Sequence, residues 1–159
     1  MAPVTGRHTA RIDGDFVVFL IGMRINKPWQ PRRWVPVLAA MAPMVDELRA
    51  QPGSGLLGAH YGLVFGGPML VQYWRSFAQL EAYARDADKH HLPAWTRYNR
   101  AIRGTTAVGV YHETYRVAAG SYEALYVDTP RMGLALAGSH EAVGSASTAS
   151  QRLGMQGSA

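Results

Sequence analysis

The sequence predicts one α+β domain built on an antiparallel sheet, and three patterns in the first half of the chain carry this prediction. Residues 16–25 form an apolar run rich in β-branched and aromatic side chains, which is typical of a buried strand. Apolar residues between 32 and 50 recur at spacings of three and four, as on the inner face of a helix. Two further β-rich runs, 56–64 and 69–74, flank the sequence Phe-Gly-Gly-Pro, which is typical of a tight hairpin.

Similar patterns continue in the second half of the chain. Ser76 and Gln79 form a capping box, so a second helix is expected to begin there. Pro93 suits the first turn of an additional helix. Residues 107–117 alternate as a strand, and residues 122–127 give the last strand. The resulting order is strand, helix, strand, strand, helix, strand. This order predicts a ferredoxin-like arrangement with an extra helix and a C-terminal extension.

Length and composition limit the domain organisation and the location. The chain has 159 residues, 48% of them hydrophobic, which suits a single core. We expect an N-terminal arm over 1–14, the α+β domain over 15–138, and a disordered tail over 139–159, where large apolar side chains are few. No stretch approaches the roughly 20 apolar residues that span a bilayer, and no signal-peptide pattern is seen. A soluble, cytoplasmic protein without a membrane partner is therefore expected.

Missing residue types and motifs exclude several kinds of chemistry. The chain has no cysteine, which excludes disulfides, thiolate metal sites and cysteine nucleophiles. The net charge of +5 comes mainly from scattered arginines, and no RNA-binding aromatic motif accompanies them, so no nucleic-acid partner is expected. Phosphate-binding glycine loops, dinucleotide fingerprints and the sequence motifs of zinc and serine hydrolases are also missing. Nicotinamide, flavin and ATP chemistry therefore have no support.

One group of candidate site residues follows the second strand of the hairpin. Trp74 and Arg75 end this strand, and His91 and Trp95 lie beyond the next helix. A neutral imidazole can serve as an iron ligand or as a general base, so His91 is a candidate for both catalysis and metal binding. The alternative interpretation is that His91 caps a helix or lies on the surface. Trp74 and Arg75 point to opposite faces of the sheet, and a tryptophan such as Trp74 is more often a core residue than a ligand contact.

A second group lies on the strand at 107–117. His112 and Glu113 are neighbours in this strand, so they face opposite sides of the sheet and cannot form a catalytic dyad. Tyr115 lies on the side of Glu113, which predicts a partly buried carboxylate with a raised pKa, suited to proton transfer. The alternative is an ion pair between Glu113 and an arginine across an interface. Arg24, in the apolar first strand, needs an acidic partner or the mouth of a cavity.

Three segments, Tyr73–Ser76, His91–Trp95 and Val110–Tyr115, together resemble the antibiotic-biosynthesis-monooxygenase superfamily, and within it the fumagillin-type monooxygenase-like branch. The resemblance covers residues 15–138. It implies a dimeric α+β barrel in which two sheets face each other, with pockets between each sheet and its helices. Haem-degrading members carry an axial histidine near the position of His91, which makes haem a candidate cofactor.

The resemblance implies a monooxygenase-like oxidoreductase of secondary metabolism that acts on a hydrophobic small molecule as a homodimer. Dimerisation also follows from the strand residues Val108 and Val110, which would otherwise form an apolar patch in water. Two alternatives remain open. One is a haem-dependent lyase or dehydratase acting on an N–O substrate, and the other is a non-catalytic protein that binds haem or a small molecule.

Two versions of the oxidoreductase assign the candidate residues differently. Without a cofactor, His91 or Glu113 removes a proton from an electron-rich substrate whose anion reacts with oxygen directly, and His112 is a further catalytic candidate. With haem, His91 binds the iron and an arginine steadies a propionate. The expected cofactor-binding residues are Arg24, Arg75, Trp74, Trp95 and Tyr115.

Overall fold

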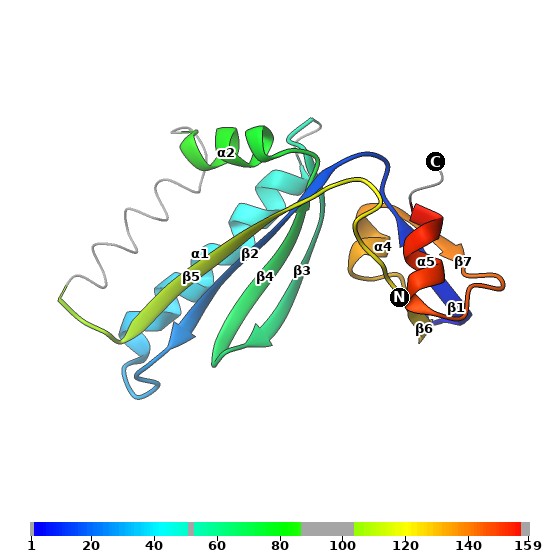
Figure 1. Cartoon of the computed structure of the whole chain (residues 1–159). Helices are drawn as coiled ribbons and strands as arrows, with labels where there is room; N and C mark the ends of the chain where they lie inside the picture. Colours follow the sequence, from blue (N-terminus) through cyan, green and yellow to red (C-terminus); the bar gives the residue numbers. More distant parts are fainter. Residues whose placement is uncertain (1, 51–52, 87–103, 157–159) are drawn as a thin grey trace.

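A computed structural model of the chain describes residues 2–50, 53–86 and 104–156 (Figure 1). Strands β2 (Phe16–Ile25), β3 (Leu56–Val64), β4 (Gly67–Trp74) and β5 (Val108–Val117) form an antiparallel sheet in the order β3-β4-β2-β5. Helices α1 (Pro31–Arg49) and α2 (Phe77–Arg85) follow β2 and β4. This strand order and connectivity are ferredoxin-like, which confirms the predicted α+β fold. None of the helices in the described ranges is long and apolar enough to cross a membrane.

The main core lies between the sheet and the two helices. One cluster of buried side chains packs against Trp34 and Val37 of α1, and a second packs beneath α2. We call this side of the sheet the helix face, and its buried residues are Val17, Met23, Ala59, Leu70, Trp74 and Val108. The predicted capping box forms at the start of α2, where Ser76 Oγ accepts from the backbone N–H of Gln79 at 3.2 Å.

The apolar patch that was expected to drive dimerisation was assigned to the wrong side of the sheet. Val108 is only 4% exposed, and Val110 packs against the same cluster beneath α1. Alternation along a strand separates two faces, but it does not indicate which face the helices cover. The opposite side, which we call the open face, carries the other set of alternating residues.

The chain ends form a second sheet, which the sequence did not predict. Strands β1 (Val4–Arg11), β6 (Tyr126–Thr129) and β7 (Ser139–Ala142) pair in the order β6-β1-β7, and α4 (Leu134–Ala137) and α5 (Ala149–Gln156) accompany them. The expectation of a disordered tail over 139–159 is therefore wrong for residues 139–156. The strand predicted at 122–127 begins later, at Tyr126, and joins this second sheet.

The tail is ordered by contacts with distant parts of the chain. β7 pairs with β1, for example Ala10 with His140. In α5, the buried Arg152 donates from Nε to Glu123 Oε1 at 2.5 Å. A charge-assisted bond of this kind satisfies an arginine that would otherwise be buried without a partner. Composition alone cannot predict such an interaction, because the partner lies far away in the sequence.

The second sheet contacts the main sheet through α4. The carbonyl of Gly133, which precedes α4, lies 3.3 Å from His60 Nε2 on β3. A Cβ atom at Gly58 would lie 3.3 Å from Ala137, so the absence of a side chain at Gly58 lets α4 approach β3 closely. Gly58 and His60 alternate with the buried Ala59, which places α4 against the β3 side of the open face.

Two histidines stack within the second sheet. His8 on β1 and His140 on β7 have ring centroids 4.5 Å apart. Within the described ranges, His8 Nδ1 and His140 Nε2 are buried and have no hydrogen-bond partner. Burial, the neighbouring His8 and the positive charge of Arg131 lower the pKa of His140 below its usual 6.5. The folded protein therefore favours the neutral form of this imidazole.

Folding stability is expected to fall as the pH is lowered through about 6.5, because the unfolded chain binds a proton at His140 more readily than the folded chain does. Chemical unfolding at about pH 7.5 and at about pH 5.5 measures the difference. His140→Gln should reduce this difference, whereas His112→Gln, on the exposed part of β5, should leave it unchanged. An unchanged pH dependence in His140→Gln would contradict the assignment.

Candidate functional site

The open face carries ionisable side chains around an aliphatic centre. Because β2 lies between β4 and β5, the strand register arranges the residues in rows across the sheet. The central positions carry half-buried aliphatic side chains, and the positions toward β3 and β5 carry phenol, imidazole and carboxylate groups. The rows are Tyr73, Val18 and Tyr115; His60, Val71, Leu20 and Glu113; and Met69, Gly22 and Tyr111.

Tyr111 lies across the backbone of β2. A Cβ atom at Gly22 would lie only 2.4 Å from the hydroxyl oxygen of Tyr111, so any larger residue at this position would displace the Tyr111 ring. The Tyr111 hydroxyl is buried and has no hydrogen-bond partner among the described residues. Its burial, together with the negative charge of Glu113, raises the pKa of Tyr111. This phenol therefore stays protonated at neutral pH and has a hydrogen bond to donate.

Glu113 and Tyr115 form a hydrogen-bonded pair on the same face. The Tyr115 hydroxyl donates to Glu113 Oε2, and this bond and the carboxylate charge raise the pKa of Tyr115. The sequence predicted a partly buried Glu113, but in the single chain the residue is exposed, because β5 is an edge strand of the main sheet. Two protonated phenols thus flank one carboxylate beside an apolar surface.

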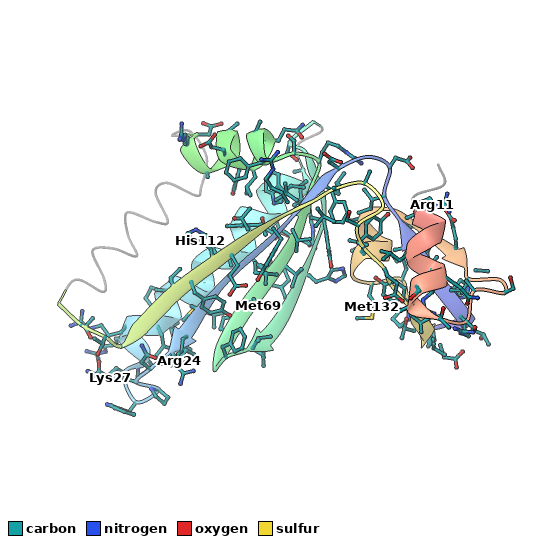
Figure 2. The ribbon with its side chains drawn as sticks, viewed as in Figure 1. Arg11, Arg24, Lys27, Met69, His112 and Met132 are labelled. Carbon is teal, nitrogen blue, oxygen red and sulfur yellow. The ribbon has the colours of Figure 1, made fainter. Side chains whose placement is uncertain are left out.

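His112 points to the other side of the sheet, as predicted. It pairs with Ile21, a residue of the helix face, and its ring centroid lies 5.8 Å from that of Phe19 (Figure 2). His112 is exposed, since β5 lies at the edge of the sheet. The structure therefore places His112 and Glu113 apart, and they cannot act on one substrate atom from within a single chain.

Trp74 is a core residue in this structure. Its side chain is 0% exposed, and its Nε1 donates to Gln72 Oε1 at 2.9 Å. The interpretation of Trp74 as packing rather than as a ligand contact fits this burial. Gln72, itself 6% exposed, was missed by the sequence analysis. A polar residue at a buried position of an apolar strand was the available signal.

Arg24 and Arg75 lie at opposite ends of the sheet. Arg24 donates from Nε to Asn26 Oδ1 at 3.1 Å and from a terminal nitrogen to the Phe65 carbonyl at 3.0 Å, so neutral acceptors take the place of the expected acidic partner. Arg75 donates to the Asp13 carbonyl at 2.5 Å. Arg75 lies opposite Phe16, so the two arginines are separated by about eight residues of strand, or roughly 27 Å. They cannot both bind one ligand group.

The described residues do not assemble a haem site. His112 is exposed at an edge of the sheet, and Arg24 lies on the opposite face. These two side chains therefore cannot contact the same haem group. Within the described ranges, no three residues of the metal-binding types come together. His91 and Trp95, which were predicted to bind or surround a cofactor, lie outside the described residues.

Comparison with known proteins assigns the chain to a family. Residues 16–134 match the Monooxygenase af470-like family, so the chain belongs to this family of monooxygenase-like proteins. Over 145 residues it is 29% identical to monooxygenase af470 of Aspergillus fumigatus, an alignment that covers 79% of this chain and 51% of that protein. The family assignment agrees with the resemblance seen in the sequence.

Solved structures support the fold. An aldoxime dehydratase (OxdRE) in complex with butyraldoxime superposes with a TM-score of 0.66 at 20% identity, covering 89% of this chain and 42% of that chain. A second aldoxime dehydratase structure has a TM-score of 0.64 at the same identity and coverage. At this identity the similarity shows the fold alone. The chain thus spans about half the length of the relatives that it matches.

Proposed function

We propose that this protein is a monooxygenase-type oxidoreductase that oxidises a hydrophobic small molecule without a cofactor, with Glu113 as the general base. The observation that carries this proposal is the carboxylate of Glu113, bonded to the Tyr115 hydroxyl and close to the buried hydroxyl of Tyr111. These groups border the aliphatic centre formed by Val18, Leu20, Met69 and Val71. An apolar surface with a few polar groups at its margin suits an aromatic substrate.

The proposed reaction begins with proton transfer. Glu113 removes a proton from an acidic CH₂ group next to an electron-rich ring, and the resulting carbanion reduces dioxygen. The overall change is R–CH₂–R′ + O₂ → R–CO–R′ + H₂O, in which the substrate supplies all the electrons. The protonated phenol of Tyr111 has a hydrogen bond to donate to an oxygen atom that becomes negatively charged, whereas the single hydroxyl proton of Tyr115 is already bonded to Glu113.

We further propose that two copies pair through their open faces. The aliphatic residues at the centre of this face are only half-buried in the single chain. Covering the open face would also remove water from Glu113 and strengthen its electrostatic interactions with bound substrate.

Light scattering at micromolar concentration should give the mass of a dimer. Leu20→Arg places a charge at the centre of the open face and should shift the protein to monomer, because an unpaired charge in an apolar interface is costly. Thr114→Arg, on the other side of the sheet, is the matched control and should remain dimeric. A monomeric wild-type protein would rule out the proposed pairing.

The function is tested by oxygen uptake. Purified protein with no haem is mixed with polycyclic phenols that carry an acidic CH₂ group, and oxygen consumption and the ketone product are followed together. Uptake matched one-to-one by product supports the proposal. Absence of turnover in the haem-free protein, with activity appearing only after haem is added, would overturn the cofactor-free mechanism.

A haem-dependent dehydratase acting on an N–O substrate is the second candidate, and the fold similarity to aldoxime dehydratases favours it. Haem would supply the iron centre, with His91 as the expected ligand. A sharp Soret band on adding haem, shifted or weakened in His91→Ala, together with nitrile formation from aldoximes without oxygen uptake, would favour this candidate. Binding without turnover in every assay would indicate a non-catalytic binding protein.

A further inference from the structure

One end of the main sheet exposes large apolar side chains. This end, which we call the tip, consists of residues 24–33 and 63–66. Leu63 is 86% exposed, Trp29 72% and Phe65 64%. Figure 2 shows Arg24 and Lys27 at this end and Arg11 and Met132 in the region of the second sheet, so the tip lies at the far end of the molecule from that sheet. Three large apolar side chains exposed at one end of a sheet are typical of an interaction site.

Hydrogen bonds hold the tip in shape. The Ile25 N–H donates to the Gly66 carbonyl at 3.2 Å, and Arg24 donates to the Phe65 carbonyl at 3.0 Å. Trp34 Nε1 donates to the Pro28 carbonyl at 3.2 Å, which ties the loop carrying Trp29 to α1. The apolar side chains are therefore displayed on a fixed frame rather than folded inward.

Phe65 supplies independent evidence that the tip has a role. Its backbone φ is +55°, a left-handed conformation that is a true outlier for a bulky residue. Its ring meets Tyr111 edge to face at a centroid distance of 5.8 Å. A hairpin turn of this kind normally carries asparagine or glycine, which adopt positive φ at little cost. A phenylalanine at this strained position indicates that its exposed ring has a functional role.

The charge around these side chains has one sign. No acidic residue occurs between positions 16 and 45 or between 56 and 80, the segments that contain the tip. Arg24, Lys27, Arg32 and Arg33 all lie in the tip. Arg32 and Arg33 stand in the first turn of α1, where the helix dipole disfavours cations and where the helix carries no acid. The tip therefore presents a positive potential around projecting apolar groups.

We propose that the tip docks on an anionic lipid bilayer. Trp29, Leu63 and Phe65 enter the headgroup region, where aromatic and aliphatic side chains are stabilised, and the cations contact the acidic lipid headgroups. Trp29 and Phe65 lie in turns and Leu63 lies near the end of β3, and side chains that project from the end of a sheet fit insertion better than they fit the flatter surface of a protein partner. This peripheral contact departs from the expected absence of a membrane partner and requires no spanning helix. It goes beyond the proposed oxidation and would bring the protein to apolar substrates dissolved in the bilayer.

Vesicle co-sedimentation of the full chain tests the proposal. The protein is expected to bind phosphatidylcholine vesicles that contain phosphatidylserine, and to bind pure phosphatidylcholine vesicles much less. Lys27→Glu combined with Arg32→Glu should lower the partition coefficient about tenfold or more. Trp29→Ala combined with Leu63→Ala should also weaken binding. Failure of the wild-type protein to bind the anionic vesicles would overturn the proposal, whatever the outcome of the oxygen-uptake assay.

A control variant separates the contribution of the tip to vesicle binding from the contribution of net charge. Arg116→Glu combined with Arg7→Glu makes the same change in net charge on β5 and β1, away from the tip, and should retain most of the binding. Equal loss in both double variants would mean that only net charge matters, and it would overturn the tip assignment. Sedimentation velocity without lipid completes the test: dissociation of a dimer by the Trp29 and Leu63 variant would identify the tip as an interface between copies instead.

Discussion

Replacing Glu113 with glutamine is expected to slow oxygen-dependent turnover by about 10²–10⁴-fold, the usual contribution of a positioned general base. Glutamine keeps the size of the side chain and still accepts the hydrogen bond from the Tyr115 hydroxyl, but it cannot take a proton. The Michaelis constant should change little, because the apolar surface that binds the substrate is unaltered. Steady-state oxygen uptake across a range of substrate concentrations separates these two effects.

Three further variants test whether the loss of turnover is specific to Glu113. Glu141→Gln, on β7 of the second sheet, removes an equivalent charge far from the open face and should be fully active. Tyr115→Phe should have a smaller effect than Glu113→Gln, since it removes a hydrogen bond but leaves the base in place. His112→Gln should retain activity. If His112→Gln is inactive while Glu113→Gln turns over normally, the reaction takes place on the helix face and the proposed base is wrong.

The strands and helices of the main sheet were predictable because their signals are local. The run of apolar residues in β2, the capping box at Ser76 and the glycines between β3 and β4 each act within a few residues. The opposite orientations of His112 and Glu113 followed for the same reason, because alternation is a property of every strand. Local patterns do not show which face the helices cover, and so Val108 was assigned to the wrong side.

The remaining errors concern contacts between distant parts of the chain. β7 has only four residues and β1 is not strongly apolar, and each depends on pairing with a strand more than a hundred residues away. In the candidate site, the neighbour of Gly22 was also not predictable from the local sequence. A glycine within an apolar strand indicates close approach by another group, but only the register with β5 identifies that group as Tyr111. Such pairings are set by the tertiary structure and leave no local signal.

Replacing Trp74 with alanine is expected to lower the free energy of unfolding by about 3–5 kcal/mol, which is a large share of the stability of a small domain. The side chain is completely buried between β2 and α2, where it packs with Val17, Leu80 and Tyr83. Its removal leaves a cavity and also removes the donor to Gln72 Oε1, an acceptor that would then be buried without a partner. Denaturant unfolding measures the loss as a lower midpoint with a similar slope.

Two variants identify the source of this loss. Trp29→Ala removes the same side chain from a site that is 72% exposed and should change the unfolding free energy by less than about 0.5 kcal/mol. Trp74→Phe keeps most of the buried volume but loses the N–H group, so it should fall between the wild type and Trp74→Ala. If Trp74→Ala is as stable as Trp29→Ala, the indole is not held in the core, and a role for Trp74 in lining a ligand pocket becomes the better interpretation.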